Sequence, residues 1–168
     1  MARYPFSQAR ANGFTLVEIV IVLALVAVVG SVSLFFGLDS FRAYAFHSDR
    51  DLLVATLEHA RAEAIGNQCQ ANSESVCVDG RPHGVRIDAD RIHLFQTVAA
   101  MPDYTHRDAS VDAVFVSNEH TTFGGDSEVV FSQLSGDVAT PAAITVTEAG
   151  GRISTITIGA EGQISWTN

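Results

Sequence analysis

The residue with the clearest chemical role is Glu18, which lies inside an otherwise apolar run, GFTLVEIVIVLALVAVV, over residues 13–29. Placing a carboxylate in hydrocarbon costs about 2.5 kcal/mol or more, so an acid in such a run indicates a function that involves a partner. The chemistry expected of Glu18 is therefore the pairing of its charge with a cation that also enters the apolar region.

The segment that must position Glu18 is expected to be a membrane-spanning helix. It covers residues 14–36, and 18 of these 23 residues are apolar. A helix of this length spans about 34 Å, which exceeds a hydrocarbon core of about 30 Å. The preceding residues carry Arg3 and Arg10 and no acid. This end is therefore expected to stay cytoplasmic, with the rest of the chain outside the cytoplasm.

Three interpretations of this segment are open. It could be a plain anchor, a secretory signal removed after its apolar stretch, or a signal that is cut before that stretch. A weak small-residue cleavage site lies around Ser31 and Ser33. The run is long for a secretory signal, contains an acid and leads directly into a further helical pattern, and these features argue against the secretory interpretation.

Gly13 and the following FTLVE, with the long aliphatic run after it, resemble the prepilin signal of type IV pilins and type II secretion pseudopilins. The resemblance implies that residues 1–13 are a leader peptide, that a prepilin peptidase cuts between Gly13 and Phe14, and that Phe14 becomes N-methylated. It also implies that Glu18, at the fifth mature position, is used in assembly. The implied partners are the prepilin peptidase, other pilins or pseudopilins, an inner-membrane assembly platform, and membrane lipid before assembly.

The spacing of Phe14 and Glu18 supports a register role for the acid. After cleavage, the α-amino group of Phe14 is a cation about 6 Å along the helix axis from Glu18. In a filament, Glu18 of one subunit could pair with the amine of its neighbour and fix the stagger between packed helices, as buried polar groups fix register in coiled coils. The alternative is that the carboxylate is satisfied by its own chain or reaches the membrane interface.

Residues 37–66 have the pattern of an amphipathic helix, because apolar residues recur every three or four positions while charged residues occupy the other faces. This stem is expected to end near Gly66 and Asn67, which have the turn chemistry of a helix C-terminus. His59 and Glu63 are four residues apart and could place two metal ligands on one face. The sequence shows no third ligand, so no metal site is expected.

Residues 67–168 are expected to form a β-rich head. From His83 onward, short runs rich in Val, Ile, Thr and aromatic residues are separated by Asp, Gly, Pro and Asn. The seven expected strands are HGVRID, RIHLFQTV, VDAVFVS, EVVFSQL, AAITVTE, RISTITIG and QISWT, the last two joined by a hairpin at Gly159 and Gly162. The predicted fold class is α+β and pilin-like. A long N-terminal helix, membrane-spanning in its first half and amphipathic in its second, packs on an antiparallel sheet or sandwich.

The stem and head also resemble the GspH/FimT-type minor pilins. The resemblance lies in ATLEHARAEAI, EVVFSQLSGDV and ITVTEAGGRISTITIGAEGQISW, which contains a G-x-I element at Gly162 to Ile164. It implies a role near a filament tip or in the initiation of assembly. Some FimT-like members are associated with DNA capture through Arg residues near the carboxyl end, where this chain has Arg152. DNA contact at Arg152 is therefore an alternative.

The charge of the chain argues against broad binding to nucleic acid or anionic lipid. Nineteen acids and ten bases give a formal net charge of -9 over 168 residues, and all ten bases are Arg. Phosphate binding requires clustered positive charge, which this balance does not supply.

The remaining chemistry-bearing residues have weaker patterns. Cys69 and Cys77 lie in a polar, Ser-rich segment and could close a short disulfide in an oxidising compartment, with two unpaired thiols as the alternative. Acids in residues 88–90 and 124–128 could supply oxygen ligands to calcium, but neither segment has EF-hand spacing, and a role in turns is expected. No motif for a catalytic nucleophile, a phosphate loop, zinc or a dinucleotide occurs, so neither an enzymatic activity nor a cofactor is expected.

These patterns favour a minor pilin or pseudopilin. It would be held in the inner membrane with an extracytoplasmic head until it assembles into a type IV pilus or a type II secretion pseudopilus. Two alternatives stay open: a minor pilin whose head binds DNA or a surface ligand, and a single-pass anchored extracytoplasmic domain that does not polymerise. The sequence does not distinguish a pilus from a pseudopilus, because both use the same signal and helix.

Overall fold

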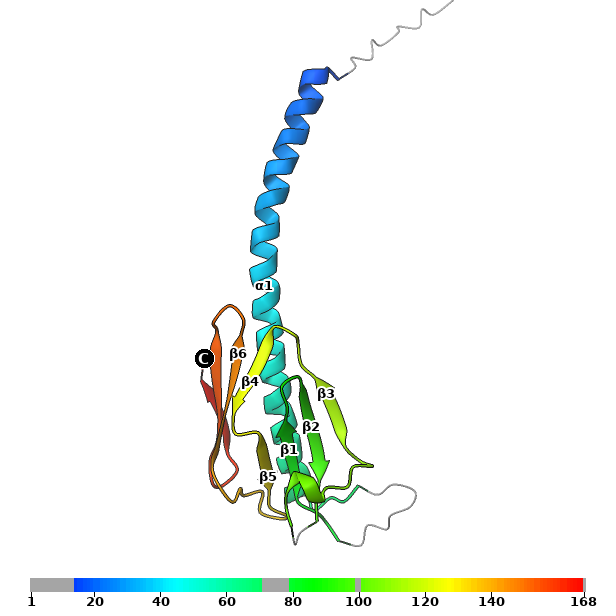
Figure 1. Ribbon diagram of the computed structural model, residues 1–168, viewed down its shortest axis with the longest axis vertical. Coiled ribbons are helices and arrows are strands. Elements are labelled where there is room, and N and C mark those ends of the chain that lie inside the picture. The colour runs from blue at the N-terminus through cyan, green and yellow to red at the C-terminus, as the bar shows by residue number, and fades with distance from the viewer. Residues whose placement is uncertain (1–13, 71–78, 99–100, 168) are drawn as a thin grey trace, which may run out of the picture. The chain divides into compact units, whose positions relative to one another are not determined.

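The computed structural model describes residues 14–70, 79–98 and 101–167, without the side chains of residues 33–38. The described chain contains one long helix, a short 3-10 helix and eight strands (Figure 1). The elements are α1 (Leu16–Ile65), β1 (His83–Ile87), β2 (Arg91–Gln96), η1 (Tyr104–His106), β3 (Ala113–Val116), β4 (Thr121–Gly125), β5 (Glu128–Phe131), β6 (Ala142–Glu148), β7 (Ile153–Ile158) and β8 (Ile164–Thr167). Two compact units, Met1–Ser40 and Phe41–Asn168, divide the chain, and each is described by itself.

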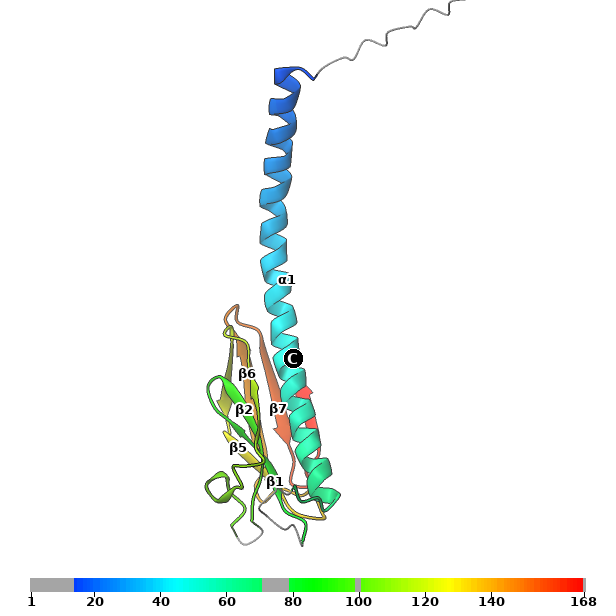
Figure 2. The same ribbon diagram turned by 90° about the vertical axis from the view of Figure 1, so that its right-hand side faces the viewer.

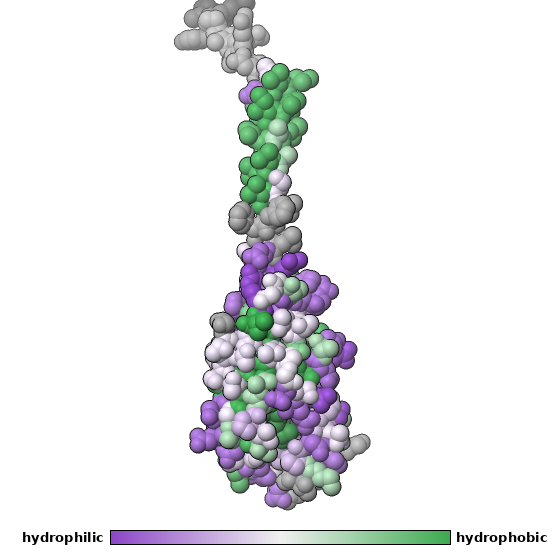
Figure 3. Space-filling model, turned by 60° about the vertical axis from the view of Figure 1, so that its left-hand side comes forward, coloured by the Kyte–Doolittle hydropathy of each residue, from purple (hydrophilic) through white to green (hydrophobic). Residues whose placement is uncertain are grey.

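The first unit contains the amino-terminal part of α1. The side chains of residues 14–32 are all exposed, and most are apolar, as the green surface in Figure 3 shows. Over the residues that the structure describes, no helix has both the length and the apolar character needed to cross a membrane. The predicted span over residues 14–36 includes side chains at 33–36 that lie outside this description, so the span remains a prediction.

In the second unit, α1 ends in a hydrogen-bonded turn. The N–H of Gln68 donates to the carbonyl of Glu63 at 3.0 Å, and the N–H of Asn67 donates to that of Ala64 at 3.2 Å. Asn67 has a positive φ of 51°, so these bonds form a Schellman motif that satisfies carbonyls at the helix end. The predicted end of the stem near Gly66 and Asn67 is confirmed.

Two four-stranded antiparallel sheets pack with this part of α1. Their strand orders are β3-β2-β1-β5 and β4-β6-β7-β8, and both sheets lie beside the C-terminal half of the helix (Figure 2). Helix and sheets share one core. Its buried apolar side chains include Phe46, Leu53, Leu57, Ala60 and Ala64 from α1, Val85, Ile92, Leu94, Val129 and Phe131 from the first sheet, and Ile144, Val146, Ile156 and Ile158 from the second. The predicted α+β class is confirmed.

Strand register places apolar side chains on the core face of each sheet. Val85 of β1 lies between Leu94 of β2 and Val129 of β5, and Ile144 of β6 pairs with Ile156 of β7. All five side chains are buried. Because alternate residues of a strand point to opposite faces, a slip of one residue would turn these side chains away from the core.

The structure contains one strand, β4, that the sequence pattern does not predict. Its sequence, TTFGG, ends in two glycines, which favour a turn. Gly124 nonetheless pairs with Thr145 of β6, and a Cβ atom at Gly124 would lie 2.9 Å from the Thr145 hydroxyl oxygen. Glycine here permits close approach between strands, and the expectation that residues 124–128 form a turn is wrong for Gly124 and Gly125.

The predicted hairpin between β7 and β8 is present. The N–H of Gly162 donates to the carbonyl of Gly159 at 2.8 Å, and Gly162 has a φ of 71°. A Cβ atom at Gly162 would collide with the carbonyl oxygen of Gly136 and lie 2.8 Å from the Nε atom of Arg61. Glycine is needed at this position for both its backbone conformation and its small size.

Candidate functional site

The first turn of α1 carries the expected assembly residue. Thr15 precedes the helix, and its Oγ1 atom accepts a hydrogen bond from the backbone N–H of Glu18 at 3.2 Å. The carbonyl of Thr15 accepts a helical bond from the N–H of Ile19, also at 3.2 Å. Thr15 is therefore the N-cap residue, and Thr15 and Glu18 have the T-x-x-E spacing of a capping box.

Glu18 is exposed at the positive end of the helix dipole. A carboxylate in the first turn of a helix stabilises it by about 0.3–1 kcal/mol when exposed. Phe14, the expected mature terminus, is also exposed, and Gly13 lies outside the described residues. Phe14 and Glu18 lie at the same end of α1, while cleavage, methylation and the assembly role remain predictions.

A buried polar cluster joins the end of α1 to β1. Glu63 is 5% exposed and accepts a hydrogen bond from the side-chain amide of Gln70 at 2.7 Å. The Nε2 atoms of His83 and His59 lie 3.6 Å and 3.7 Å from the two carboxylate oxygens of Glu63. The sequence pairs only His59 with Glu63, because His83 arrives from a distant strand. Within the described part of the chain, no group of three His, Cys, Asp or Glu side chains could hold a metal ion.

Burial sets the protonation of His83. Desolvation lowers the pKa of His83 below its ordinary value of 6.5, and the Glu63 carboxylate opposes this effect. The imidazole is therefore neutral near pH 7. Its Nδ1 atom lies 3.0 Å from the carbonyl oxygen of Arg81, and a carbonyl only accepts, so Nδ1 carries the proton and donates.

The buried side-chain amide of Gln96 fixes the segment that follows α1. The side chain of Gln96 accepts a hydrogen bond from the N–H of Gln70 at 2.9 Å and donates one to the carbonyl of Gln70 at 2.6 Å. Cys69, the preceding residue, is disulfide-bonded. Cys77 lies outside the described residues, so its pairing with Cys69 remains a prediction.

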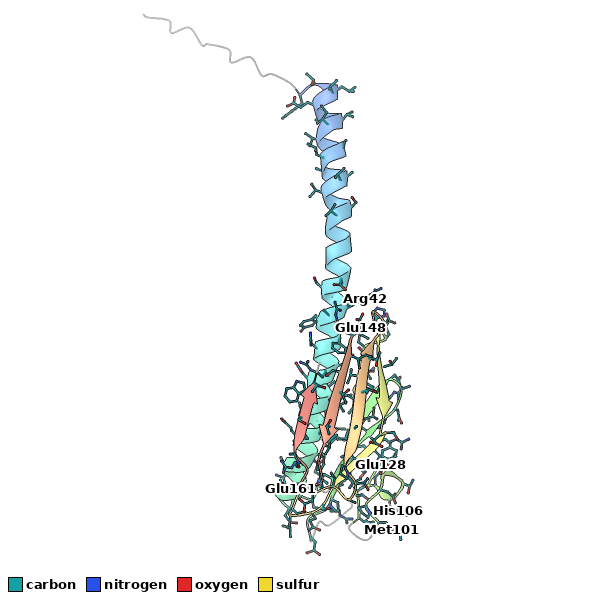
Figure 4. All side chains as sticks on the ribbon, turned by 90° about the vertical axis from the view of Figure 1, so that its left-hand side faces the viewer. Arg42, Met101, His106, Glu128, Glu148 and Glu161 are labelled. Carbon is teal, nitrogen blue, oxygen red and sulfur yellow. The ribbon has the colours of Figure 1, made fainter. Side chains whose placement is uncertain are left out.

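Arg152, the expected DNA contact, lies against a buried acid. Its Nη1 atom is 3.4 Å from the Oε2 atom of Glu148, which is 2% exposed. Glu161, which also lies near Arg152 in the sequence, lies toward the other end of the unit (Figure 4), where its carbonyl accepts a bond from Arg61 at 3.0 Å. A guanidinium that neutralises a buried carboxylate has less charge to offer a phosphate. DNA contact at Arg152 remains a prediction.

The acidic segments considered as calcium ligands are used within the fold. Asp88 lies 3.3 Å from Arg86 and 3.2 Å from the Nε2 atom of His93. Glu128 accepts a hydrogen bond from the N–H of Tyr104 at 2.8 Å. These carboxylates are therefore engaged by donors of the chain itself.

The sequence does not predict the side-chain contacts that Tyr104 makes on the surface of the first sheet. The Cζ atom of Arg107 lies 3.9 Å from the centre of its ring, which is cation–π geometry. Asp103, the residue before Tyr104, accepts hydrogen bonds from Thr105 and His106. These bonds lower the pKa of Asp103 to about 2. The sequence does contain a local signal for this turn: Asp103 precedes Thr105 and His106 at the spacing by which an acid caps the turn that follows.

Comparison with known proteins bears on the amino-terminal segment. A family model described as "Prokaryotic N-terminal methylation motif" matches residues 8–34. A search of curated proteins gave no match. Among solved structures, the minor pseudopilin EpsH from the Type 2 Secretion System of Vibrio cholerae is similar, with 18% identity and a TM-score of 0.48 over 73% of this chain and 95% of that chain. A likeness at this level carries no conclusion about the function of this chain.

The matched residues include Phe14 and Thr15, which precede α1, and Glu18 in its first turn, and they cover the run on which the resemblance to a prepilin signal rests. The predicted resemblance is therefore confirmed for this part of the chain. Residues 8–34 of this protein match the prokaryotic N-terminal methylation motif.

Proposed function

We propose that this protein is a minor pilin or pseudopilin that assembles into a type IV pilus or a type II secretion pseudopilus. The observation that carries the proposal is the methylation motif over residues 8–34, which contains the expected cleavage position after Gly13. The capped first turn of α1, with Glu18 exposed, supports it. The role is structural rather than enzymatic.

Maturation begins when a prepilin peptidase removes residues 1–13, and Phe14 is then N-methylated. Cleavage removes Arg3 and Arg10, so eight Arg remain against 19 acids and the formal net charge changes from -9 to -11. It also creates an α-amino cation on Phe14. The processed chain thus gains a cation close to the acid that needs a partner in an apolar environment.

Before assembly, residues 14–36 anchor the chain in the inner membrane, with residues 37–66 as a stem and residues 67–168 as an extracytoplasmic head. The exposed apolar side chains of residues 14–32 support this, because a contiguous apolar surface needs lipid or another helix to cover it. The inner-membrane assembly platform transfers the subunit from lipid to the filament. The GspH/FimT resemblance favours a place near the tip or in initiation.

Glu18 sets the register between neighbouring subunits. Its carboxylate pairs with the amine of Phe14 on the adjacent chain, so two groups that are costly in an apolar medium neutralise one another at one stagger of the packed helices. The capping bond from Glu18 to Thr15 uses the backbone N–H, which leaves the carboxylate to serve the partner.

The test is the intact mass and amino-terminal sequence of the protein recovered from cells that contain a prepilin peptidase. We expect a chain that starts at methylated Phe14. Glu18→Ala should be processed in the same way but absent from sheared filaments, whereas the neighbouring Val17→Ala, which keeps the charge, should be incorporated. A mature chain that starts at Met1 or beyond Ser33 would overturn the proposal, and normal incorporation of Glu18→Ala would overturn the register role.

A further inference from the structure

Strand β3 forms one edge of the first sheet. It pairs with β2 on one side, and Figure 1 shows it on the outer side of that sheet. The N–H of Ser117 donates to the carbonyl of Asp90 at 3.0 Å, which identifies this pair as hydrogen-bonded. Because such pairs alternate along an antiparallel ladder, Phe115 directs its backbone groups to β2. Val114 and Val116 therefore direct their N–H and C=O groups to the outer edge.

The side chains of this edge are apolar and exposed. Val114 is 48% exposed and Val116 is 70% exposed, and the strand sequence, AVFV, contains no charge and no proline. Natural proteins usually blunt an edge strand with a lysine, a proline or a bulge, because its free backbone groups can pair with another chain. Within the strand itself, β3 has none of these devices.

Two other edge strands are partly closed by the chain itself. Beside β5, Phe131 forms a bridge with Val138, and the N–H of Ser132 donates to the carbonyl of Asp137 at 2.8 Å. The turn that leads into β8 is tied to α1 by the bond from Arg61 described above. For β3, no comparable bond or bridge on its outer side occurs among the described residues.

Exposed acids lie at one end of β3. At its start, Asp112 is mostly buried and already pairs with Arg107 at 2.6 Å. At the other end, Glu119 follows the strand with a strongly exposed side chain, and Asp90 lies opposite Ser117. A docked strand would therefore meet apolar side chains along β3 and exposed carboxylates at the end beside Ser117. The net charge of -9 on each chain disfavours a second copy as the occupant, because like charges repel.

We propose that β3 is a docking edge for an extended segment of a different protein, which adds a fifth strand to the first sheet. The segment has small β-branched residues at its centre, which pack beside Val114 and Val116, and Lys or Arg at the end beside Ser117, which approaches Glu119 and Asp90. The backbone groups of Val114 and Val116 supply the hydrogen bonds, and the acids select the partner. This inference holds whether or not the chain polymerises.

The experiment uses the full processed chain in detergent and a synthetic peptide in which Val alternates with Thr between two terminal lysines. Hydrogen exchange of the protein amides is measured with and without the peptide. Docking should slow exchange at Val114 and Val116 and leave the buried strand β6 unchanged. A peptide of the same sequence with terminal glutamates should bind about tenfold more weakly or worse.

Two variants at Val116 distinguish the contribution of its outward backbone N–H from that of its side chain. Val116→Pro removes an outward N–H without breaking the ladder to β2, a position where an edge strand tolerates proline, and should abolish peptide binding. Val116→Thr keeps the N–H and the branched shape and should retain binding. If Val116→Pro does not fold, the exchange measurement on the unaltered chain decides.

Four results would overturn the proposal. They are no slowing of exchange at Val114 and Val116 with the lysine peptide, equal binding of the glutamate peptide, full binding by a folded Val116→Pro variant, or self-association of the unaltered chain that Val116→Pro abolishes. The last result would assign the edge to a second copy instead.

Discussion

The Oγ1 atom of Thr15 accepts a hydrogen bond from the backbone N–H of Glu18 at 3.2 Å, at the first turn of α1. This relationship gives Glu18 two properties that can be separated. Its backbone N–H binds the capping residue Thr15, which any non-proline residue at this position can support, and its charge can pair with a cation in an apolar environment. A single substitution can retain the first and remove the second.

Glu18→Gln is that substitution. Because the bond to Thr15 uses the backbone N–H of residue 18, and Gln suits this position of a capping box as Glu does, we expect the variant to keep the exchange protection of the first helical turn and normal leader cleavage. It should nonetheless be absent from sheared filaments, as expected of Glu18→Ala, because the charge is lost. Incorporation of Glu18→Gln at the unaltered level, with Glu18→Ala excluded, would show that a polar side chain is enough at this position and that the charge is not required.

The buried imidazole of His83 predicts a loss of stability on acidification. Burial lowers the pKa of His83 below 6.5 in the folded chain, so the unfolded chain binds a proton that the folded chain does not. Its contribution is fully present above about pH 6.5 and is lost as the pH falls toward the lower, folded pKa. The ionisable side chains that act on His83 are Glu63, which opposes the shift, and His59, which adds to it.

Denaturant unfolding of the full chain in detergent at a series of pH values measures this effect. We expect the free energy of unfolding to decrease between pH 7 and pH 5, and His83→Gln to flatten that decrease, since Gln does not titrate. His47→Gln, at an exposed position on α1, should leave the slope unchanged. An equal slope in the His83 variant and the unaltered chain would contradict the assignment.

The sequence predicted an element correctly where that element depends on interactions between residues close together in the chain. The alternating pattern of AAITVTE gives β6, because side chains on one face reach the core, and Gly66 and Asn67 mark the helix end through their turn chemistry. The sequence could not reveal β4, because Gly124 and Gly125 resemble a turn until Thr145 is seen to lie against them. Local propensity is overridden there by tertiary packing.

The contacts of the candidate site show the same difference between residues close in the chain and residues far apart. Thr15 and Glu18 are close in sequence, so their spacing alone predicts the cap. The approach of His83 to Glu63 depends on how β1 packs against α1, which no spacing encodes. The sequence predicts only part of the contact between Arg152 and Glu148. It places the two residues close together but does not show that Glu148 is buried.

Gly162→Ala is expected to destabilise the junction between the β7–β8 hairpin and α1. An added Cβ atom would collide with the carbonyl oxygen of Gly136 and approach Arg61, and the positive φ of 71° is unfavourable for Ala. We expect a loss of about 1–3 kcal/mol in the free energy of unfolding. Gly151→Ala, which shares a positive φ but has no atom near the added Cβ, is the control for strain alone and should cost less.

The predicted bridge between Cys69 and Cys77 can be measured by mass. Alkylation of the denatured, unreduced protein should add no thiol adduct, and reduction should expose two thiols. Closing so short a loop stabilises the folded chain by about 2–3 kcal/mol in the chain-entropy model, so Cys69→Ser with Cys77→Ser should lower the free energy of unfolding by a similar amount. Two alkylated thiols without reduction would exclude the intramolecular bridge.

Arg152 is expected to matter for stability rather than for DNA retention. Arg152→Ala would leave the buried Glu148 carboxylate without this cation, 3.4 Å away in the folded chain, and we expect a loss of about 1–3 kcal/mol in the free energy of unfolding. Arg91→Ala removes a cation from an exposed pair with Asp90 and should cost about 0–1 kcal/mol. Neither variant should change retention of the protein on DNA at low salt, because the chain is acidic and phosphate binding requires several cations. Salt-sensitive retention of the unaltered chain that Arg152→Ala abolishes would instead restore the DNA-binding alternative.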